Sequence, residues 1–318
     1  MNTLLASDSR CVEQVLTGTT RRTAGQLALW EQSGWVVRLF DLPVQRGEVH
    51  FNPTVVVFRG EPLLITRTAT NIGQVNETSK LCFWSIGNPM RLRRCFQVEG
   101  WQVEDPRAFV NRDELVVGWC RYRPGEWPTQ YVSYFDAHLD LLRTERPLFG
   151  RQGSGPEKNW VWFSHNASSY FVYDPCPHVV ACYTEGKVTG SWVSSWSGDQ
   201  LWPYGIMRGG TPPVRHHDEY VTFYHSSMLW QGQRRRYVMG CYTFEAKPPF
   251  VVKKLTRCPL LWGSEAALGQ PMSPLTVFAS GALFVNDTWF VVFGINDYAC
   301  GWVEIPHEDL QLALCPIP

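Results

Sequence analysis

The sequence predicts an all-β fold, a five-bladed β-propeller with four-stranded blades. Aromatic residues make up 14% of the 318 residues, and aromatic side chains fit the half-buried surface of strands. Most of the chain reads as short alternating or apolar runs separated by Gly, Pro, Asn and Asp, which is the pattern of strands and turns. Helical periodicity is confined to 11–17, 304–313 and the ambiguous 25–30. A hairpin-like unit also recurs along the chain, as expected for a repeat architecture.

Each repeat unit opens on polar or small residues, enters a strand, turns, and returns as an apolar strand. The five units cover residues 51–67, 104–119, 157–173, 210–225 and 279–293. Their openings at Asn52, Asp105, Lys158 and Thr211 are 53 residues apart, and the step to Ser280 is 69. Each unit leaves room for two more strands, so we expect one propeller domain over 1–318, with 1–25 as a candidate N-terminal extension. We expect 35–40 to form the outer strand that joins the last blade and closes the ring.

Charge and cysteine usage narrow the class of protein. Lys and Arg number 29, as do Asp and Glu, and no basic stripe is visible, so we expect no nucleic-acid partner. No run reaches the roughly 18 apolar residues of a membrane span, and the first residues lack a signal-peptide pattern, so we expect no membrane association. Ten cysteines without C-x-x-C or zinc-ligand spacing predict buried, reduced thiols in a cytoplasmic protein. No metal or cofactor is expected, His216-His217-Asp218 is interpreted as a solvated turn, and the oligomeric state is left open.

The polar openings of the units indicate where a ligand binds. In a propeller the first strand of each blade lies along the central axis, so the residues that open it gather at one mouth of the channel. These positions carry Asn52, Glu104, Asp105, Arg107, Glu157, Lys158, Asn159, Thr211 and Ser280. Polar groups that converge from several blades between aromatic walls are typical of a concave carbohydrate site. In the alternative interpretation they bond backbone groups and neighbouring blades, and Asp105-Pro106-Arg107 is an ion pair that braces a turn.

The five openings together resemble glycoside hydrolase family 130, the mannoside phosphorylases and β-mannoside hydrolases, and the related β-1,2-mannosyltransferases. The resemblance runs from about Asn52 to Asp297, and Glu104-Asp105-Pro106-Arg107 matches the most specific motif of that family. The other matching segments are Phe51-Asn52 with Arg67, Gly210-Thr211-Pro212-Pro213, Tyr224-His225-Ser226, Ser280-Gly281 and Gly294-Ile295-Asn296-Asp297. The resemblance implies an innermost sugar subsite formed by Asn52, Arg67, Asp105 and Arg107, with Tyr224, His225 and Asp297 on the opposite wall.

The sequence departs from this family at two functional positions. Family phosphorylases carry a Tyr-Asp pair after the second blade's return strand, and its Asp is the general acid, whereas the matching position here is Tyr122-Arg123. An Arg cannot donate a proton at neutral pH. Their phosphate-binding His-Arg-Pro segment corresponds here to 173–178, which ends in His178 and lacks the Arg. Lys158 is still available to contact an anion, as a point charge.

Three functions are compatible with these residues. The first is a glycosyltransferase-like enzyme that holds an anionic donor, a sugar phosphate or sugar nucleotide, with the basic groups Arg67, Arg107, Arg123 and Lys158. The second is a glycoside hydrolase or phosphorylase acting on mannosides, whose candidate carboxylates are Glu104, Asp105, Glu126, Glu157 and Asp297. The third is a non-catalytic sugar-binding propeller. The arginine content favours the first. The predicted catalytic residues are Glu104 and Asp105, and the predicted ligand-binding residues are Asn52, Arg67, Arg107, Arg123, Lys158, Asn159, His178, Thr211, Tyr224, His225 and Asp297.

Overall fold

The computed structural model describes residues 20–21, 35, 37–45, 47–72, 74, 76–151, 154–196, 198–230, 234–263 and 275–318. Within these ranges the chain is largely strand, and the strands join into four hydrogen-bonded sheets. The all-β prediction is therefore confirmed.

The first two predicted units lie in one eight-stranded sheet that consists of two antiparallel meanders. The first meander contains β3 (Glu48–Phe58), β4 (Glu61–Thr70), β5 (Thr78–Ser85) and β6 (Arg91–Phe96). The second contains β7 (Gln102–Asn111), β8 (Glu114–Tyr122), β9 (Thr129–Phe135) and β10 (Leu141–Glu145). One parallel pairing, Ser79 with Gln102, joins the two meanders.

The other predicted units lie in three further sheets. The third unit is in a four-stranded sheet of β11 (Val161–His165), β12 (Ser168–Pro175), β13 (His178–Thr184) and β14 (Lys187–Ser194). After the short helix α2 (Gly198–Leu201), the fourth is in a six-stranded sheet of β15 (Val214–His216), β16 (Glu219–Trp230), β17 (Arg234–Glu245), β18 (Val252–Thr256), β19 (Leu261–Trp262) and β23 (Leu314–Pro316). The fifth is in a five-stranded sheet of β20 (Val277–Val285), β21 (Thr288–Ile295), β22 (Ala299–Pro306), β2 (Val37–Phe40) and β1 (Thr20–Arg21).

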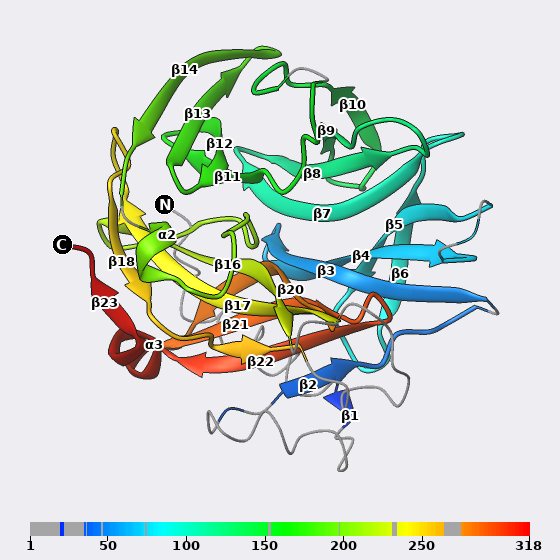
Figure 1. Cartoon of the computed structure of the whole chain (residues 1–318). Coiled ribbons are helices and arrows are strands. Elements are labelled where there is room, and N and C mark those ends of the chain that lie inside the picture. The colour runs from blue at the N-terminus through cyan, green and yellow to red at the C-terminus, as the bar shows by residue number, and fades with distance from the viewer. Residues whose placement is uncertain are drawn as a thin grey trace.

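Segments that are distant in the sequence close the arrangement. β2 pairs antiparallel with β22, with Val37 opposite Val303, so the prediction that 35–40 completes the last unit is confirmed in β2. The helix α3 (His307–Ala313) confirms part of the helical pattern at 304–313, and β23 then pairs with β18. Figure 1 shows β2 beside β22 and β23 beside β18. The helical patterns predicted at 11–17 and 25–30 lie outside the described residues.

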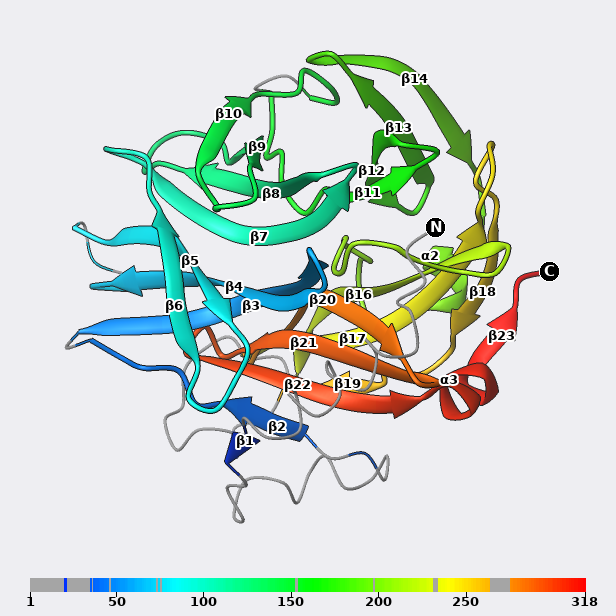
Figure 2. The same ribbon diagram turned by 180° about the vertical axis from the view of Figure 1, so that it is seen from behind.

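The sheets are arranged around a common centre. In Figures 1 and 2, β3, β7 and β20 lie near the middle, whereas β6, β10, β14 and β18 lie at the outside. β3 packs beside both β7 and β20, and β7 packs beside β11. The residues that open the fourth unit complete this inner layer, because Arg208 and Thr211 donate backbone hydrogen bonds to His225 and Phe223 of β16 at 2.8 and 2.7 Å.

Two of the inner strands are interrupted near the centre by β-bulges. The register shifts between Phe51 and Thr54 in β3 and between Glu104 and Arg107 in β7. Asn52 and Asp105 have φ angles of 46° and 51° at these bulges, in the left-handed region that Asn and Asp tolerate better than most residues. A bulge redirects a side chain out of the strand's alternation, and here it aims two polar side chains at the centre. Near the start of the third unit, Asn159 is also left-handed, with φ 64°, one position after the predicted opening.

Most of the large aromatic side chains fill the core between the sheets. The tryptophans that are almost fully buried are Trp119, Trp160, Trp162, Trp202, Trp289 and Trp302. Trp162 of β11, for example, stacks on Phe109 of β7 with an interplanar angle of 6° and so fixes the second unit against the third. In the described ranges no helix is long and apolar enough to span a membrane.

Candidate functional site

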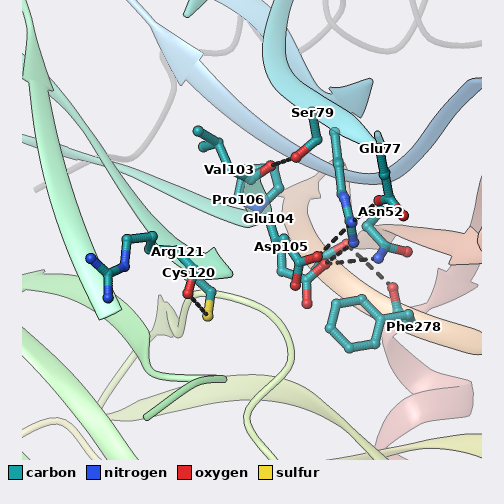
Figure 3. Close-up of polar contacts among 12 residues, drawn as sticks. Asn52, Glu77, Ser79, Val103, Glu104, Asp105, Pro106, Cys120, Arg121 and Phe278 are labelled. Carbon is teal, nitrogen blue, oxygen red and sulfur yellow. Dashed lines mark hydrogen bonds and ion pairs between the residues drawn. The ribbon is translucent and has the colours of Figure 1, made fainter. Parts of the chain in front are cut away.

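Arg67 of β4 is the centre of a carboxylate cluster that is contributed by separate segments. Its Nη2 donates to Glu104 Oε1 of β7 at 2.6 Å and to Glu77 Oε1, just before β5, at 3.0 Å. Its Nη1 lies 3.9 Å from Asp105 Oδ1, and its guanidinium covers the Phe51 ring at 4.7 Å. Only 9% of Arg67 is exposed, so these ion pairs are poorly screened. Figure 3 shows Glu77, Glu104, Asp105 and Asn52 converging on one point.

Asn52 fixes the position of Asp105. Its Nδ2 donates to Asp105 Oδ1 at 2.8 Å, and the same side chain hydrogen-bonds Asp297, in the turn after β21. Gly294 makes room for this amide, because a Cβ at that position would overlap Asn52 Oδ1. The cluster therefore joins β3, β4, β7 and the end of β21, and the predicted residues Asn52, Arg67, Glu104, Asp105 and Asp297 do lie together.

The cluster has more carboxyl groups than cations, and this changes their protonation. Burial raises the pKa of Glu104 to about 7, although Arg67 opposes the shift, and Asp105 raises it further. Burial likewise raises the pKa of Asp297. About 17% of the Glu104 side chain is exposed. A carboxyl group with a pKa of about 7 can donate or accept a proton at neutral pH, as general acid–base chemistry requires.

Arg67 takes the central place among these carboxylates. In the described part of the chain, no cluster of His, Cys, Asp or Glu has the arrangement of a metal site.

Basic groups lie beside the carboxylate cluster. Arg107 of β7 is 1% exposed, donates to the carbonyl oxygens of Asp105 and Pro106 at 3.1 Å each, and covers the Phe278 ring at 4.8 Å. His225 of β16 packs on the other part of that ring, with centroids 4.4 Å apart. The buried Arg107 Nε and Nη2 and His225 Nδ1 have no hydrogen-bond partner within the described residues.

The pKa values of these basic groups reflect their surroundings. Burial lowers the pKa of Arg107 to about 10. Burial also lowers the pKa of His225 well below its ordinary range, and the charges of Arg107, Arg208 and Lys158 add to that effect. Lys158 is exposed, and its charge acts on both Glu104 and His225. The positive charges of Arg107 and Lys158 near His225 favour the approach of an anion.

Four predicted ligand-binding residues do not present a free polar group to this cluster. Arg123 is 59% exposed in the turn after β8 and pairs with Glu126 at 3.3 Å. His178 is buried in the core, where its Nδ1 donates to the Phe250 carbonyl oxygen at 2.9 Å and its ring packs on Phe244. Burial lowers its pKa to about 4.

Tyr224 and Thr211 are the other two. Tyr224 is fully buried against Trp202, because its side chain points into the core of the sheet instead of the centre. The Thr211 hydroxyl accepts a hydrogen bond from Phe223 N at 3.0 Å, and the Thr211 carbonyl oxygen accepts one from the Thr222 hydroxyl. Thr211 therefore attaches its segment to β16. The charge of Lys158, by contrast, acts on Glu104 of the cluster, and Asn159 stays a predicted ligand-binding residue.

Two hydrolase candidates are also placed elsewhere. Glu126 is exposed and pairs with Arg121 and Arg123. Glu157 is 7% exposed and receives hydrogen bonds from Arg151 N, Trp160 Nε1 and Tyr173 Oη, which makes it a structural carboxylate.

Two residues of the site were missed in the sequence. Glu77 follows a polar loop without any motif, and it reaches Arg67 only because that loop folds back between β4 and β5. Phe278 lies in an apolar run that reads as core, and only the pairing of β20 with the centre places its ring between Arg107 and His225. Neither position carried a sequence signal that would have separated it from its neighbours.

No protein-family model and no curated protein matches this sequence. Solved structures do match it. The β-1,2-mannobiose phosphorylase from Listeria innocua, in complex with β-1,2-mannobiose, is 15% identical over 86% of this chain and 94% of its own, with a TM-score of 0.68. A structure described with the mannoside phosphorylases and β-1,2-mannoside hydrolases of glycoside hydrolase family 130 is 13% identical over 92% and 94%, with a TM-score of 0.64.

A third similar structure is a GDP-mannose-dependent mannosyltransferase from Leishmania mexicana, 12% identical over 82% of this chain and 85% of its own, with a TM-score of 0.59. The chain therefore has the fold of this group of proteins, an all-β, propeller-type architecture. The resemblance to glycoside hydrolase family 130 that the sequence motifs predicted is confirmed at the level of the fold.

Proposed function

We propose that this protein is a carbohydrate-active enzyme that transfers a mannosyl unit from an anionic donor, a sugar phosphate or sugar nucleotide. The proposal depends on the close placement of acidic and basic side chains at one site. Carboxyl groups organised by Arg67 lie beside the basic face of Arg107, His225 and Lys158. The similarity in fold to enzymes that act on mannosides supports the choice of sugar.

The acidic part suits the sugar and its acceptor. Carboxylates accept hydrogen bonds from sugar hydroxyls, and Asn52 holds Asp105 in one orientation for that purpose. In the transfer step, the acceptor oxygen forms a bond to the anomeric carbon while the bond from that carbon to the phosphate oxygen breaks. The acceptor proton passes to Asp105, which acts as the base, and the protonated Glu104 donates a hydrogen bond to a hydroxyl of the transferred sugar.

The basic part suits the leaving group. A departing phosphate carries negative charge, and preorganised cations stabilise it most where water is excluded. Lys158 is exposed and lies within reach of such a group, while Arg107 and His225 form the buried floor behind it. A neutral glycan alone would not require this concentration of basic groups.

Hydrolysis or phosphorolysis of a mannoside is the second candidate. It is favoured by the raised pKa of Glu104, because a glycosidase needs one carboxyl group that is protonated at neutral pH beside a second carboxyl group. In that reaction Glu104 would protonate the leaving oxygen, and water or phosphate would attack. A non-catalytic sugar-binding role uses the same contacts without turnover.

A panel of donors and acceptors separates these functions. Purified protein is incubated with GDP-mannose or mannose 1-phosphate and mannose or β-1,2-mannobiose, or with β-1,2-mannobiose in water or phosphate, and the products are separated by chromatography. We expect a mannosyl-extended acceptor from an anionic donor. We expect Lys158→Ala to raise the KM for that donor at least tenfold, because one charge-assisted contact to it is lost. Lys187→Ala, which changes an exposed lysine of β14, is the control and should leave KM unchanged.

Other outcomes of the same panel decide against transfer. Mannose from β-1,2-mannobiose in water alone identifies a hydrolase, and mannose 1-phosphate from the same sugar in phosphate identifies a phosphorylase. Binding of β-1,2-mannobiose without any product identifies a binding protein.

We further propose that the fold is one propeller of five blades over the whole chain. The eight-stranded sheet supplies two of them, since its two meanders share only the Ser79–Gln102 pairing. The other three sheets supply one blade each, and β2 completes the blade that β20, β21 and β22 begin. Segments of all five blades then surround the site, whose side chains come from β3, β4, β7, β16, β20 and the end of β21 and from the segments before β5 and β11.

A further inference from the structure

Cys82 and Cys95 face each other across two neighbouring strands, away from the carboxylate cluster. Cys82 lies in β5 and Cys95 in β6, and the two residues are direct register partners. Their sulfur atoms are 3.1 Å apart. Directly opposed residues of an antiparallel pair have Cα atoms about 4.5–5.5 Å apart, within the span of about 4.4–6.8 Å that a disulfide bridges. A bond between these sulfurs therefore requires little movement of the backbone.

The two thiols differ in exposure. Cys82 is 2% exposed and packs with Leu64 and Trp84 in the core, whereas Cys95 is exposed on the outer strand of its meander. Lys80 lies two residues before Cys82, on the same face of β5, and its ammonium group is close enough to act on Cys95. Of the two thiols, only that of Cys95 is accessible to a reagent from solution. The Cys82 thiol is the one placed to react next with the modified Cys95 sulfur.

The chemistry of the pair matches this division. The hydrogen bond between the two sulfurs lowers the pKa of Cys95 to about 7, with a further contribution from Lys80. The same hydrogen bond, together with burial, raises the pKa of Cys82. Thiolates are the reactive form, so Cys95 is the nucleophile of the pair. No other two of the nine described cysteines have their sulfurs in contact.

We propose that Cys82 and Cys95 are a reversible redox pair in which Cys95 reacts first with hydrogen peroxide and Cys82 resolves the product. The Cys95 thiolate attacks one peroxide oxygen, the O–O bond breaks, and Cys95 becomes a sulfenic acid while hydroxide leaves and takes up a proton. Cys82 then attacks the Cys95 sulfur, the S–S bond forms, and water leaves. Two thiols are oxidised to one disulfide as one peroxide is reduced to two waters. A dithiol reductant reverses the change.

The experiment uses the full-length, reduced protein and hydrogen peroxide in equimolar amount. We expect the intact mass to fall by two hydrogens, peptide mapping to show a Cys82–Cys95 bridge, and dithiothreitol to restore two free thiols. Cys95→Ser should abolish the bridge and slow peroxide consumption at least tenfold. Cys82→Ala should leave a sulfenic acid on Cys95 that dimedone labels. Cys258→Ser removes another exposed thiol and is the control, which should form the bridge at the wild-type rate.

Two results would overturn the proposal. One is a wild-type protein in which Cys82 and Cys95 are still alkylated separately after peroxide has oxidised other thiols. The other is a Cys95→Ser variant that consumes peroxide at the wild-type rate. The wild-type mapping needs no substitution, so it decides the matter even if the change at the buried Cys82 impairs folding. None of these readouts depends on the proposed mannosyl transfer.

Discussion

Asp105→Asn is expected to lower the rate of mannosyl transfer by about 10²- to 10⁴-fold, the usual contribution of a positioned acid or base. The substituted amide can still accept the hydrogen bond from Asn52, so the site should keep its shape while losing the base. The measurement is kcat with saturating GDP-mannose and acceptor. Asp140→Asn, which changes an exposed aspartate paired with Arg94, is the matched control and should leave kcat unchanged. A near-wild-type kcat for Asp105→Asn would remove Asp105 from the mechanism.

The pH dependence of the same rate defines the role of Glu104. Because its pKa lies at about 7, the carboxyl group loses its proton as the pH rises through 7, and the wild-type rate should fall over that interval. Glu104→Gln keeps a neutral hydrogen-bond donor at every pH. In a transferase that needs only the donated hydrogen bond, this variant should stay active and its rate should no longer fall above pH 7. Loss of all activity at every pH would instead make Glu104 a general acid, as in a hydrolase.

Arg67→Met is expected to reduce the free energy of unfolding by about 3–5 kcal/mol at pH 8, as when one partner of a buried ion pair is removed. The change leaves Glu77, Glu104, Asp105 and Asp297 without the cation that they surround. Because the remaining carboxyl groups then have raised pKa values in the folded state only, the variant should regain stability as the pH falls through 7.

Urea unfolding at several pH values measures this effect. Arg123→Met is the matched control, since its ion pair with Glu126 is exposed and should contribute no more than about 1 kcal/mol. Equal losses for the two variants would mean that the cluster does not depend on Arg67.

The sequence was sufficient to predict the all-β fold because its signals are local and repeated. Alternation, turn residues and the recurring openings each report on one hairpin, and the hairpins at 51–67 and 104–119 recur as β3–β4 and β7–β8. The long-range pairing of β2 with β22 was also predicted, because 35–40 reads as a strand that belongs to none of the five hairpins.

The site was only partly predictable, because its geometry depends on which way each side chain points. Asn52, Glu104 and Asp105 were found because they open two of the repeat units and belong to recognisable motifs. Tyr224 and His225 are adjacent in one strand and therefore point to opposite faces, so only His225 reaches the centre. Glu77 comes from a loop and Phe278 from an apolar strand. The local sequence around each residue does not predict which side chains it contacts.

The most direct test of the central claim is a crystal structure of the Asp105→Asn variant with GDP-mannose and an acceptor sugar. We predict a mannosyl ring that contacts Asn52 and Arg67, and a phosphate group that contacts Lys158 beside Arg107. Ligand bound at another place on the protein, or a mannosyl ring whose phosphate points away from these basic groups, would contradict the account.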